Sequence, residues 1–243
     1  MMTREDVLRE LELLPEWKLR AQPAPAEKHE KTSAAPQAAL VQPNLEAPSR
    51  TSIESMDWRA LQACVKNCQA CGLAKTRTQT VFGVGDENAD WLIVGEAPGA
   101  EEDKRGEPFV GQAGKLLDNM LAAIELKRGE NVYIANVLKC RPPENRDPHG
   151  EEVMQCSPYL KRQVELIKPK LIIALGKFAA QTLLNSDATV TSLRGKLHHY
   201  CGVPVIVTYH PAYLLRNLAD KAKAWDDLCL AKSAMAKMSE SGL

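Results

Sequence analysis

Four short apolar runs constrain most strongly what this chain can fold into. They cover residues 91–95, 132–137, 171–175 and 204–209. Their side chains do not alternate between apolar and polar, which is typical of parallel strands that are covered on both faces. Segments with helical periodicity separate and follow the runs, notably 112–125, 150–167, 177–184 and 221–238. This order predicts an α/β fold, a three-layer α/β/α sandwich with a central four-stranded parallel sheet.

The residues before these runs have a different composition. Residues 1–20 hold the pattern of a short amphipathic helix, which Thr3 can cap and Pro15 ends. Residues 21–55 are rich in Ala and Pro and almost lack branched apolar side chains, so we expect a disordered linker. The α/β domain is predicted for residues 56–238. The N-terminal helix is expected either to pack back on that domain, or to have little function, or to dock a protein partner.

Charge and apolar patterning exclude several classes of protein. Lys and Arg together number 31, as do Asp and Glu, so the formal net charge is zero and a polybasic chain is excluded. Any contact with nucleic acid must then come from a local basic patch. No stretch approaches the ~18 apolar residues of a membrane span, and the first residues do not resemble a secretory signal. We therefore expect a cytoplasmic protein without a membrane partner.

Chemically active side chains follow the ends of the predicted strands. Glu96 follows the first strand, and the acidic run 101–103 comes soon after it. Asn136 lies near the end of the second strand, and His210 follows the fourth. The carboxyl ends of parallel strands meet at one edge of a sheet, where ligands bind. Carboxylates, an amide and an imidazole are therefore expected at a common site.

Each of these side chains also has a purely structural interpretation. The acidic run could be a solvated turn, Asn136 could fix a loop, and His210 could simply end its strand. The glycines nearby match neither the Walker sequence nor Gly-x-Gly-x-x-Gly, so a nucleotide cofactor is not indicated.

Four of the seven cysteines have the spacing of metal ligands. Cys68 and Cys71 form a Cys-x2-Cys pair, and Cys140 and Cys156 form a Cys-x15-Cys pair. Without an export signal, such thiols are expected to bind metal or to be buried rather than to form disulfides. Four sulfur ligands suit zinc or an iron–sulfur cluster. The other three are interpreted as helical, buried or incidental thiols, namely Cys64, Cys201 and Cys229.

Taken together, the motifs resemble those of the type-4 uracil-DNA glycosylases. The motifs that carry the resemblance are Cys68-x2-Cys71, Gly95-Glu-Ala-Pro-Gly99 with Glu102-Asp103, Pro108-Phe-Val-Gly-Gln-Ala-Gly114, Asn136-Val-Leu-Lys-Cys140-Arg-Pro-Pro143 and His210-Pro-Ala-Tyr-Leu-Leu-Arg216. The resemblance covers residues 64–235 and leaves out the N-terminal extension. Many members of the family have Gly where this chain has Ala97.

This resemblance implies a DNA repair enzyme that flips uracil out of DNA and hydrolyses its N-glycosidic bond. The products are free uracil and an abasic site, the first step of base excision repair. It also implies a [4Fe–4S] cluster, whose ligands would be Cys68, Cys71, Cys140 and Cys156. A monomer that acts on single- or double-stranded uracil-containing DNA is expected.

The same resemblance assigns residues to base recognition. Phe109 would stack on uracil, and the amide of Asn136 would read its hydrogen-bonding edge. Backbone N–H groups of the turn from Gly95 to Ala97 would contact the base, so the Ala in place of Gly matters little.

Other residues are assigned to hydrolysis. His210, together with the same turn, would stabilise the negative charge that develops on uracil O2. Glu96 or Glu102 would orient the attacking water, or these carboxylates would act mainly by electrostatic stabilisation of the sugar cation, and the alternatives stay open.

A local cationic face is expected beside the pocket despite the zero net charge. The residues expected to contact phosphates are Lys139, Arg141, Arg146 and Arg216. Leu214 and Leu215 are candidates either for a wedge into the base stack or for packing of their loop.

Two other functions fit parts of the pattern. A non-catalytic, metal-bound nucleic-acid module of the replication machinery would keep the fold and the cysteines. It would not need the convergent set of Phe109, Asn136 and His210. A zinc-stabilised hydrolase of nucleotides would fit the glycine-rich turns, but the chain lacks a phosphate-binding motif.

Overall fold

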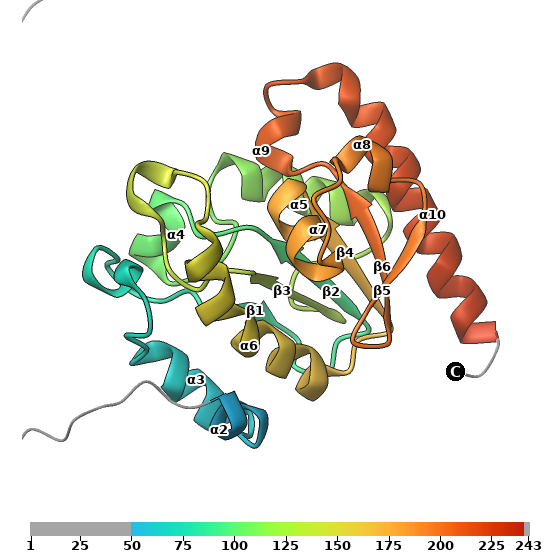
Figure 1. Ribbon diagram of the computed structural model, residues 1–243. Coiled ribbons are helices and arrows are strands. Elements are labelled where there is room, and N and C mark those ends of the chain that lie inside the picture. Colours follow the sequence, from blue (N-terminus) through green and yellow to red (C-terminus); the bar gives the residue numbers. More distant parts are fainter. Residues whose placement is uncertain (1–49, 241–243) are drawn as a thin grey trace, which may run out of the picture. The chain divides into compact units, whose positions relative to one another are not determined.

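The predicted strands form the centre of a six-stranded sheet in the computed structural model, which describes residues 50–240 (Figure 1). The sheet order is β1-β3-β2-β4-β6-β5. The strands are β1 (Val84–Gly85), β2 (Trp91–Gly95), β3 (Val132–Asn136), β4 (Leu171–Leu175), β5 (Leu197–Tyr200) and β6 (Val203–Thr208). Strands β3, β2, β4 and β6 are parallel neighbours, which confirms the predicted fold class.

Helices cover both faces of this sheet, as the unbroken apolar runs require. The helices of the described residues are α2 (Arg50–Glu54), α3 (Trp58–Lys66), α4 (Ala100–Arg105), α5 (Gln112–Ala123), α6 (Gly150–Ile167), α7 (Lys177–Leu184), α8 (Val190–Leu193), α9 (Pro211–Leu214) and α10 (Lys221–Glu240). Short 3-10 turns add η1 (Gly72–Lys75), η2 (Pro143–Asn145) and η3 (Leu218–Asp220). The four predicted helical segments correspond to α5, α6, α7 and α10.

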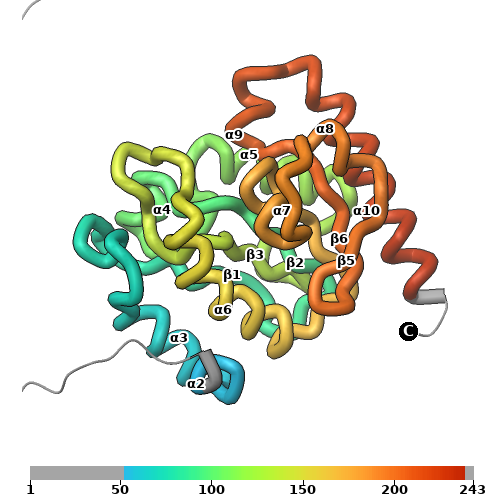
Figure 2. The backbone as a smooth tube through the Cα atoms, in the orientation of Figure 1, coloured from blue at the N-terminus to red at the C-terminus, as the bar shows by residue number. Residues whose placement is uncertain are grey.

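Alternate side chains of each central strand enter two separate cores. On β2, Leu92 and Val94 pack with α3, α6 and α7, whereas Trp91 and Ile93 pack with α5, α9 and α10. Figure 2 shows α3 and α10 on opposite sides of the sheet. Because successive side chains of a strand point to opposite faces, both sets must be apolar.

The two edge strands, which the sequence analysis missed, are antiparallel. β1 pairs with β3, and β5 pairs with β6. β1 has only two residues, and β5 alternates between exposed and half-buried side chains. Neither therefore has the apolar run that marks a strand covered on both faces.

The ordered domain begins earlier than the predicted boundary at residue 56. Helix α2 lies inside the segment expected to be a linker, and its Ile53 is 3% exposed within the core. The predicted N-terminal helix and residues 21–49 of the linker lie outside the described residues. In the part of the chain that the structure describes, no helix is long and apolar enough to cross a membrane.

Candidate active site

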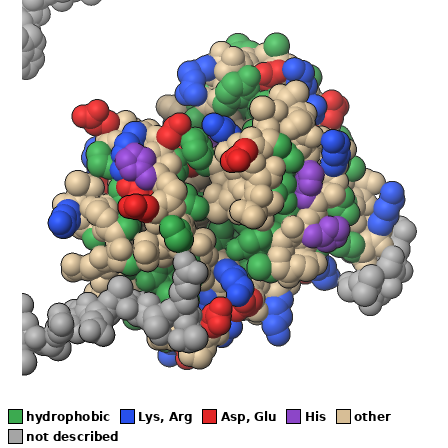
Figure 3. All heavy atoms as spheres, viewed as in Figure 1, with side chains coloured by type: hydrophobic (Ala, Val, Ile, Leu, Met, Phe, Trp, Pro, Cys, Tyr) green, Lys and Arg blue, Asp and Glu red, His purple; other side chains and the backbone are tan. Residues whose placement is uncertain are grey.

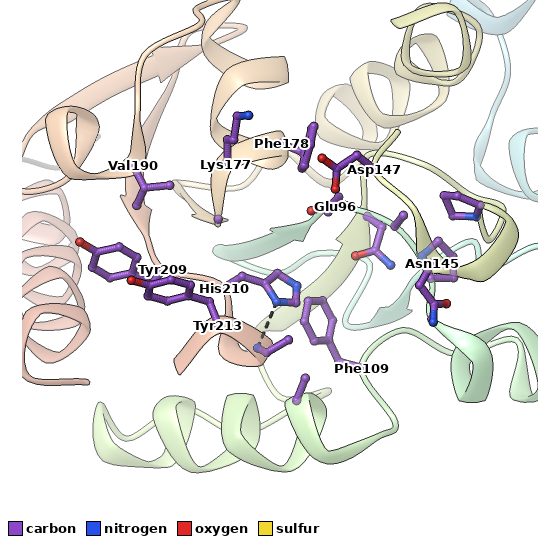
Figure 4. A pocket seen from close by; sticks show the side chains of 18 of the residues that line it. Glu96, Phe109, Asn145, Asp147, Lys177, Phe178, Val190, Tyr209, His210 and Tyr213 are labelled. Atoms are coloured by element: carbon purple, nitrogen blue, oxygen red, sulfur yellow. Dashed lines mark hydrogen bonds between the residues drawn. The ribbon is translucent and has the colours of Figure 1, made fainter. Parts of the chain in front are cut away.

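A pocket of about 880 Å³ opens at the carboxyl ends of the four parallel strands (Figure 4). Each strand supplies a lining residue at its end or just beyond it, namely Glu96, Asn136, Gly176 and His210. Phe109 enters from the loop between α4 and α5. The structure thus brings together the carboxylate, amide and imidazole that the strand ends suggested.

Asn136 and Phe109 line this pocket, and both pack against Gly95 at the end of β2. Asn136 is 2% exposed, and its Oδ1 is buried without a hydrogen-bond partner. A β-carbon at Gly95 would lie 2.4 Å from that oxygen and 2.6 Å from Cζ of Phe109. Glycine at this position therefore lets the amide and the ring pack against the end of β2, which any side chain there would prevent. A hydrogen-bond donor on a ligand would satisfy this acceptor.

Phe109 is held in an unusual backbone conformation. Its φ is 55°, in the left-handed region that side chains other than glycine rarely adopt. Its ring lies 5.5 Å from that of His210, with a 30° angle between the planes. The two rings therefore share the wall of the pocket.

His210 is fixed by its own helix end. Its Nδ1 accepts a hydrogen bond from the N–H of Ala212 at 3.1 Å, and Gly176 lets it pack closely, since a β-carbon there would lie 2.8 Å from Cβ of His210. Burial, with a smaller effect from Arg216, lowers the pKa of His210 to about 4. The ring is therefore neutral near pH 7, and since Nδ1 accepts, Nε2 carries the proton.

Glu96 is the carboxylate with a perturbed pKa in this pocket. Burial raises the pKa of Glu96 to about 7, and the nearby Asp147 adds to this shift while Lys177 opposes it. Figure 4 shows Asp147 next to Glu96 at the side of the pocket away from Tyr209 and Tyr213. A carboxylate with a pKa near neutrality is suited to accept a proton from water.

Glu102 has a different environment from Glu96. Its Oε1 accepts hydrogen bonds from the N–H groups of Val110 and Gly111, at 2.9 and 3.2 Å. These bonds fix the loop that carries Phe109, although Glu102 also lines the pocket.

The other two acids of the run 101–103 are not in the pocket lining. Asp103 is 3% exposed and accepts from the N–H of Thr78, whereas Glu101 is exposed and pairs with Lys104. The run therefore lies in helix α4, and its three acidic side chains have separate roles. They form neither a common site nor a solvated turn.

Lys139 does not belong to the expected cationic face. It is 1% exposed, and its Nζ donates to the backbone oxygen of Asn136 at 2.8 Å and to Oε1 of Gln163 at 2.6 Å. Its phosphate-binding role is therefore wrong. A charge so placed anchors the end of β3 rather than contacting DNA.

The three arginines of the expected face differ in whether their guanidinium groups are already bound to neighbouring side chains. Arg146 lines the pocket but pairs with Glu152, and Arg141 donates to Oδ1 of Asn145. Arg216 is exposed at the pocket wall, and no acidic side chain of the described residues forms an ion pair with it. On the face in Figure 3, acidic and basic side chains are interspersed, in accord with the zero net charge.

The two leucines after His210 separate into one core and one surface residue. Leu214 is 1% exposed and packs between the sheet and α10, so its wedge role is wrong and its packing role is correct. Leu215 is 43% exposed and stays available for contact with DNA.

The four predicted ligand cysteines line one small recess, together with Tyr159. Each sulfur has a hydrogen-bond donor: Tyr159 for Cys68, the Leu73 N–H for Cys71, Arg77 for Cys140 and the Lys139 N–H for Cys156. Donors of this kind stabilise thiolates that bind a cluster. Within residues 50–240, no three His, Cys, Asp or Glu side chains form a group for a metal ion.

The remaining cysteines stay outside this set. Cys64 contacts the hydroxyl of Tyr159 at 3.9 Å, and Cys201 and Cys229 are exposed, which corrects the expectation that they could be buried.

Several pocket residues were not found from the sequence. They are Asn145, Asp147, Lys177, Phe178, Tyr209 and Tyr213. Lys177 follows the end of β4, so the strand-end rule could have found it. Asp147 lies in an irregular segment before α6, and its approach to Glu96 has no local sequence signal.

Comparison with known proteins gives a consistent result. The model of the Uracil DNA glycosylase superfamily matches residues 82–229. A type-4 uracil-DNA glycosylase of Archaeoglobus fulgidus is 52% identical over 62% of this chain and 79% of its own length. Those of Pyrobaculum aerophilum and Thermotoga maritima are 43% and 44% identical, over 72% and 71% of this chain and 93% and 92% of their own lengths.

Proposed function

The chain belongs to the uracil-DNA glycosylase superfamily, and we propose that it flips uracil out of DNA and hydrolyses the N-glycosidic bond. Free uracil and an abasic site are the products, as base excision repair requires. The observation that carries the proposal is the buried, unpartnered Oδ1 of Asn136, a residue that lines the pocket with Phe109 and packs against Gly95.

Recognition of uracil follows from the two ends of the Asn136 amide. Uracil presents an N3–H donor and an O4 acceptor, and Oδ1 and Nδ2 of Asn136 complement them. Cytosine lacks the hydrogen at N3 and presents an amino group in place of O4, so it would leave Oδ1 unpaired and oppose two donors. Stacking on Phe109 holds any pyrimidine, so discrimination depends on the amide.

His210 supports departure of the base. When the bond from C1′ to N1 breaks, the electron pair stays with uracil and negative charge develops on O2. The neutral ring donates a hydrogen bond from Nε2–H. The hydrogen bond from the N–H of Ala212 to Nδ1 fixes this tautomer before the base enters. A fixed donor of this kind stabilises the anion without reorganisation.

Glu96 is proposed to orient and deprotonate the water. The water oxygen bonds to C1′ as its proton passes to the Glu96 carboxylate, and the uracil anion then takes a proton from solvent. Burial and Asp147 raise the pKa of Glu96 to about 7, which gives it useful basicity near neutral pH. Oε1 of Glu102 is engaged with Val110 and Gly111, so a role in positioning their loop is assigned to it instead.

The DNA backbone is expected to cross the mouth of the pocket beside Arg216. Arg141 and Leu215 are further contacts, the first with phosphate and the second with the base stack. Arg146 contributes less, because Glu152 already neutralises it. We expect a monomer to suffice for these contacts.

The recess of Cys68, Cys71, Cys140 and Cys156 fits a [4Fe–4S] cluster. The hydrogen-bond donors to each sulfur suit thiolate ligands and support the proposal. When bound, the cluster would have a structural role, because it would join the segment at η1 and the segment before α6 to the domain.

Release of uracil from defined oligonucleotides tests the proposal. The full-length protein is incubated with single- and double-stranded DNA that contains one uracil, and free uracil and abasic sites are measured. Matched oligonucleotides with cytosine or thymine serve as controls. We expect release from uracil-containing DNA alone. Tight binding without release would instead support the non-catalytic nucleic-acid module.

A further inference from the structure

We propose that Arg128 is a positioning residue that holds the ring of Phe109 in place for stacking on uracil. Arg128 does not line the pocket, so it acts through the backbone of the loop before α5. The inference rests on the proposed function, because it assigns to Phe109 the stacking role given above.

The guanidinium of Arg128 binds two successive carbonyl groups of that loop. Nη1 donates to the oxygen of Pro108 and Nη2 donates to the oxygen of Phe109, both at 2.9 Å. A planar fork with several fixed donors can hold two acceptors at once, whereas a lysine ammonium is a single point of charge. Arg128 therefore fixes the direction of both peptide groups that flank Cα of Phe109.

A conformation such as that of Phe109 persists only when its surroundings determine it. The φ of 55° is unfavourable for a phenylalanine, so the loop would relax if its contacts were lost. Relaxation of φ and ψ at Phe109 would swing the ring away from Asn136 and His210. Arg128 thus constrains the φ and ψ angles of Phe109, which set the direction of the stacking ring.

Helix α5 supports the same carbonyl group. Asp118 of α5 accepts from Nε of Arg128 at 2.9 Å and so aligns the guanidinium. Gly114 of the same helix packs on the oxygen of Phe109, since a β-carbon there would lie 1.8 Å from it. Glu102 holds the next two N–H groups from the other side.

The pair of Arg128 and Asp118 is not part of the core. Their side chains are 25% and 49% exposed, and the pair lies on the surface beside the loop. A substitution there removes hydrogen bonds without opening a cavity, so a folded variant is expected.

The experiment compares Arg128→Gln, Arg128→Lys and Asp118→Asn with wild type. Lys127→Gln is the matched control, because Lys127 is exposed and its one ion pair within residues 50–240 is with Glu130. The measurements are kcat/KM on a uracil-containing oligonucleotide, the inhibition constant of free uracil, the thermal midpoint and the pH profile.

We expect Arg128→Gln to lower kcat/KM and to weaken inhibition by uracil, each about tenfold, the size of one lost stacking contact. Arg128→Lys should recover part of this loss and Asp118→Asn should lose less, while the pH profile stays that of wild type. In a Phe109→Ala background, Arg128→Gln should have no further effect, because the two substitutions remove the same contact.

Two results separate failure of this inference from failure of the proposed function. An inactive wild-type protein would refute the function. An active wild type with Arg128→Gln unchanged, or with an undiminished effect in the Phe109→Ala background, would refute the positioning role alone.

Discussion

Oδ1 of Asn136 faces the α-carbon of Gly95 so closely that a β-carbon at position 95 would lie 2.4 Å from it. The two residues end neighbouring parallel strands, β3 and β2, and are paired in register. The position of the amide at the end of one strand thus depends on a missing side chain at the end of the next.

Replacement of Gly95 by Ala should therefore displace the amide and the ring that are proposed to hold the base. The new methyl group would also lie 2.6 Å from Cζ of Phe109, so both side chains would have to shift from their positions. We expect kcat/KM on uracil-containing DNA to fall at least about a hundredfold, with binding of normal DNA unchanged. Gly150→Ala is the control, since nothing lies within 4 Å of a β-carbon there. Equal activity of both variants would contradict the assigned position of the base.

Asn136→Ala and His210→Ala should differ in kind. Without the amide, binding should lose its preference for uracil, because about 1–3 kcal/mol of paired polar contact is removed. Without the imidazole, the preference should remain while single-turnover cleavage slows by about 10²–10³-fold. Binding and single-turnover rates on uracil-containing and normal DNA measure both. The assigned roles are wrong if His210→Ala removes the preference but cleaves at the wild-type rate.

The rate should rise with pH through the pKa of Glu96. Burial raises this pKa to about 7, so the carboxylate is mostly protonated at pH 6 and mostly ionised at pH 8. His210, with its pKa lowered to about 4, stays neutral over the same range and adds no second step. The measurement is single-turnover rate against pH.

Two variants assign that pH dependence to Glu96. Asp147→Asn should move the midpoint to lower pH, because it removes the charge that disfavours ionisation, and Glu96→Gln should remove the slope. A wild-type midpoint that Asp147→Asn does not move would show that another group titrates.

Lys139→Met and Arg216→Gln should separate folding from DNA binding. Loss of the buried hydrogen bonds of Lys139 should lower the free energy of unfolding by about 1–3 kcal/mol, seen in denaturant titrations. Loss of the exposed Arg216 should leave that free energy unchanged but reduce the salt slope of DNA binding by about one unit. If Lys139→Met reduced the salt slope, Lys139 would contact phosphate, and the structural role assigned to it from its burial would be contradicted.

The cysteine recess should contain iron. Protein purified without air is expected to bind about four irons per chain and to be brown. Cys140→Ser should reduce iron content and thermal stability together, because the segment before α6 is released, whereas Cys201→Ser at an exposed thiol should change neither. Colourless protein with one zinc per chain would contradict the cluster.

The parallel sheet and the gathering of active side chains were predictable from the sequence. Runs such as 91–95 and 171–175 are apolar throughout because both faces of their strands are buried, and this pattern is local. The ends of parallel strands meet by topology, so Glu96, Asn136 and His210 could be placed together before any contact was known. Edge strands β1 and β5 lack that two-sided burial and gave no signal.

The state of each side chain was decided only by tertiary structure. Lys139 and Arg216 are both cations in motifs of the same site, yet one is buried against Gln163 and the other is exposed. Likewise Glu96 acquires a raised pKa from burial and Asp147, whereas Glu102 binds the loop of Phe109. Residue type and spacing set which groups reach the edge of the sheet. Burial, charge and hydrogen bonding come from segments distant in the chain, so only the folded packing determines what each group can do.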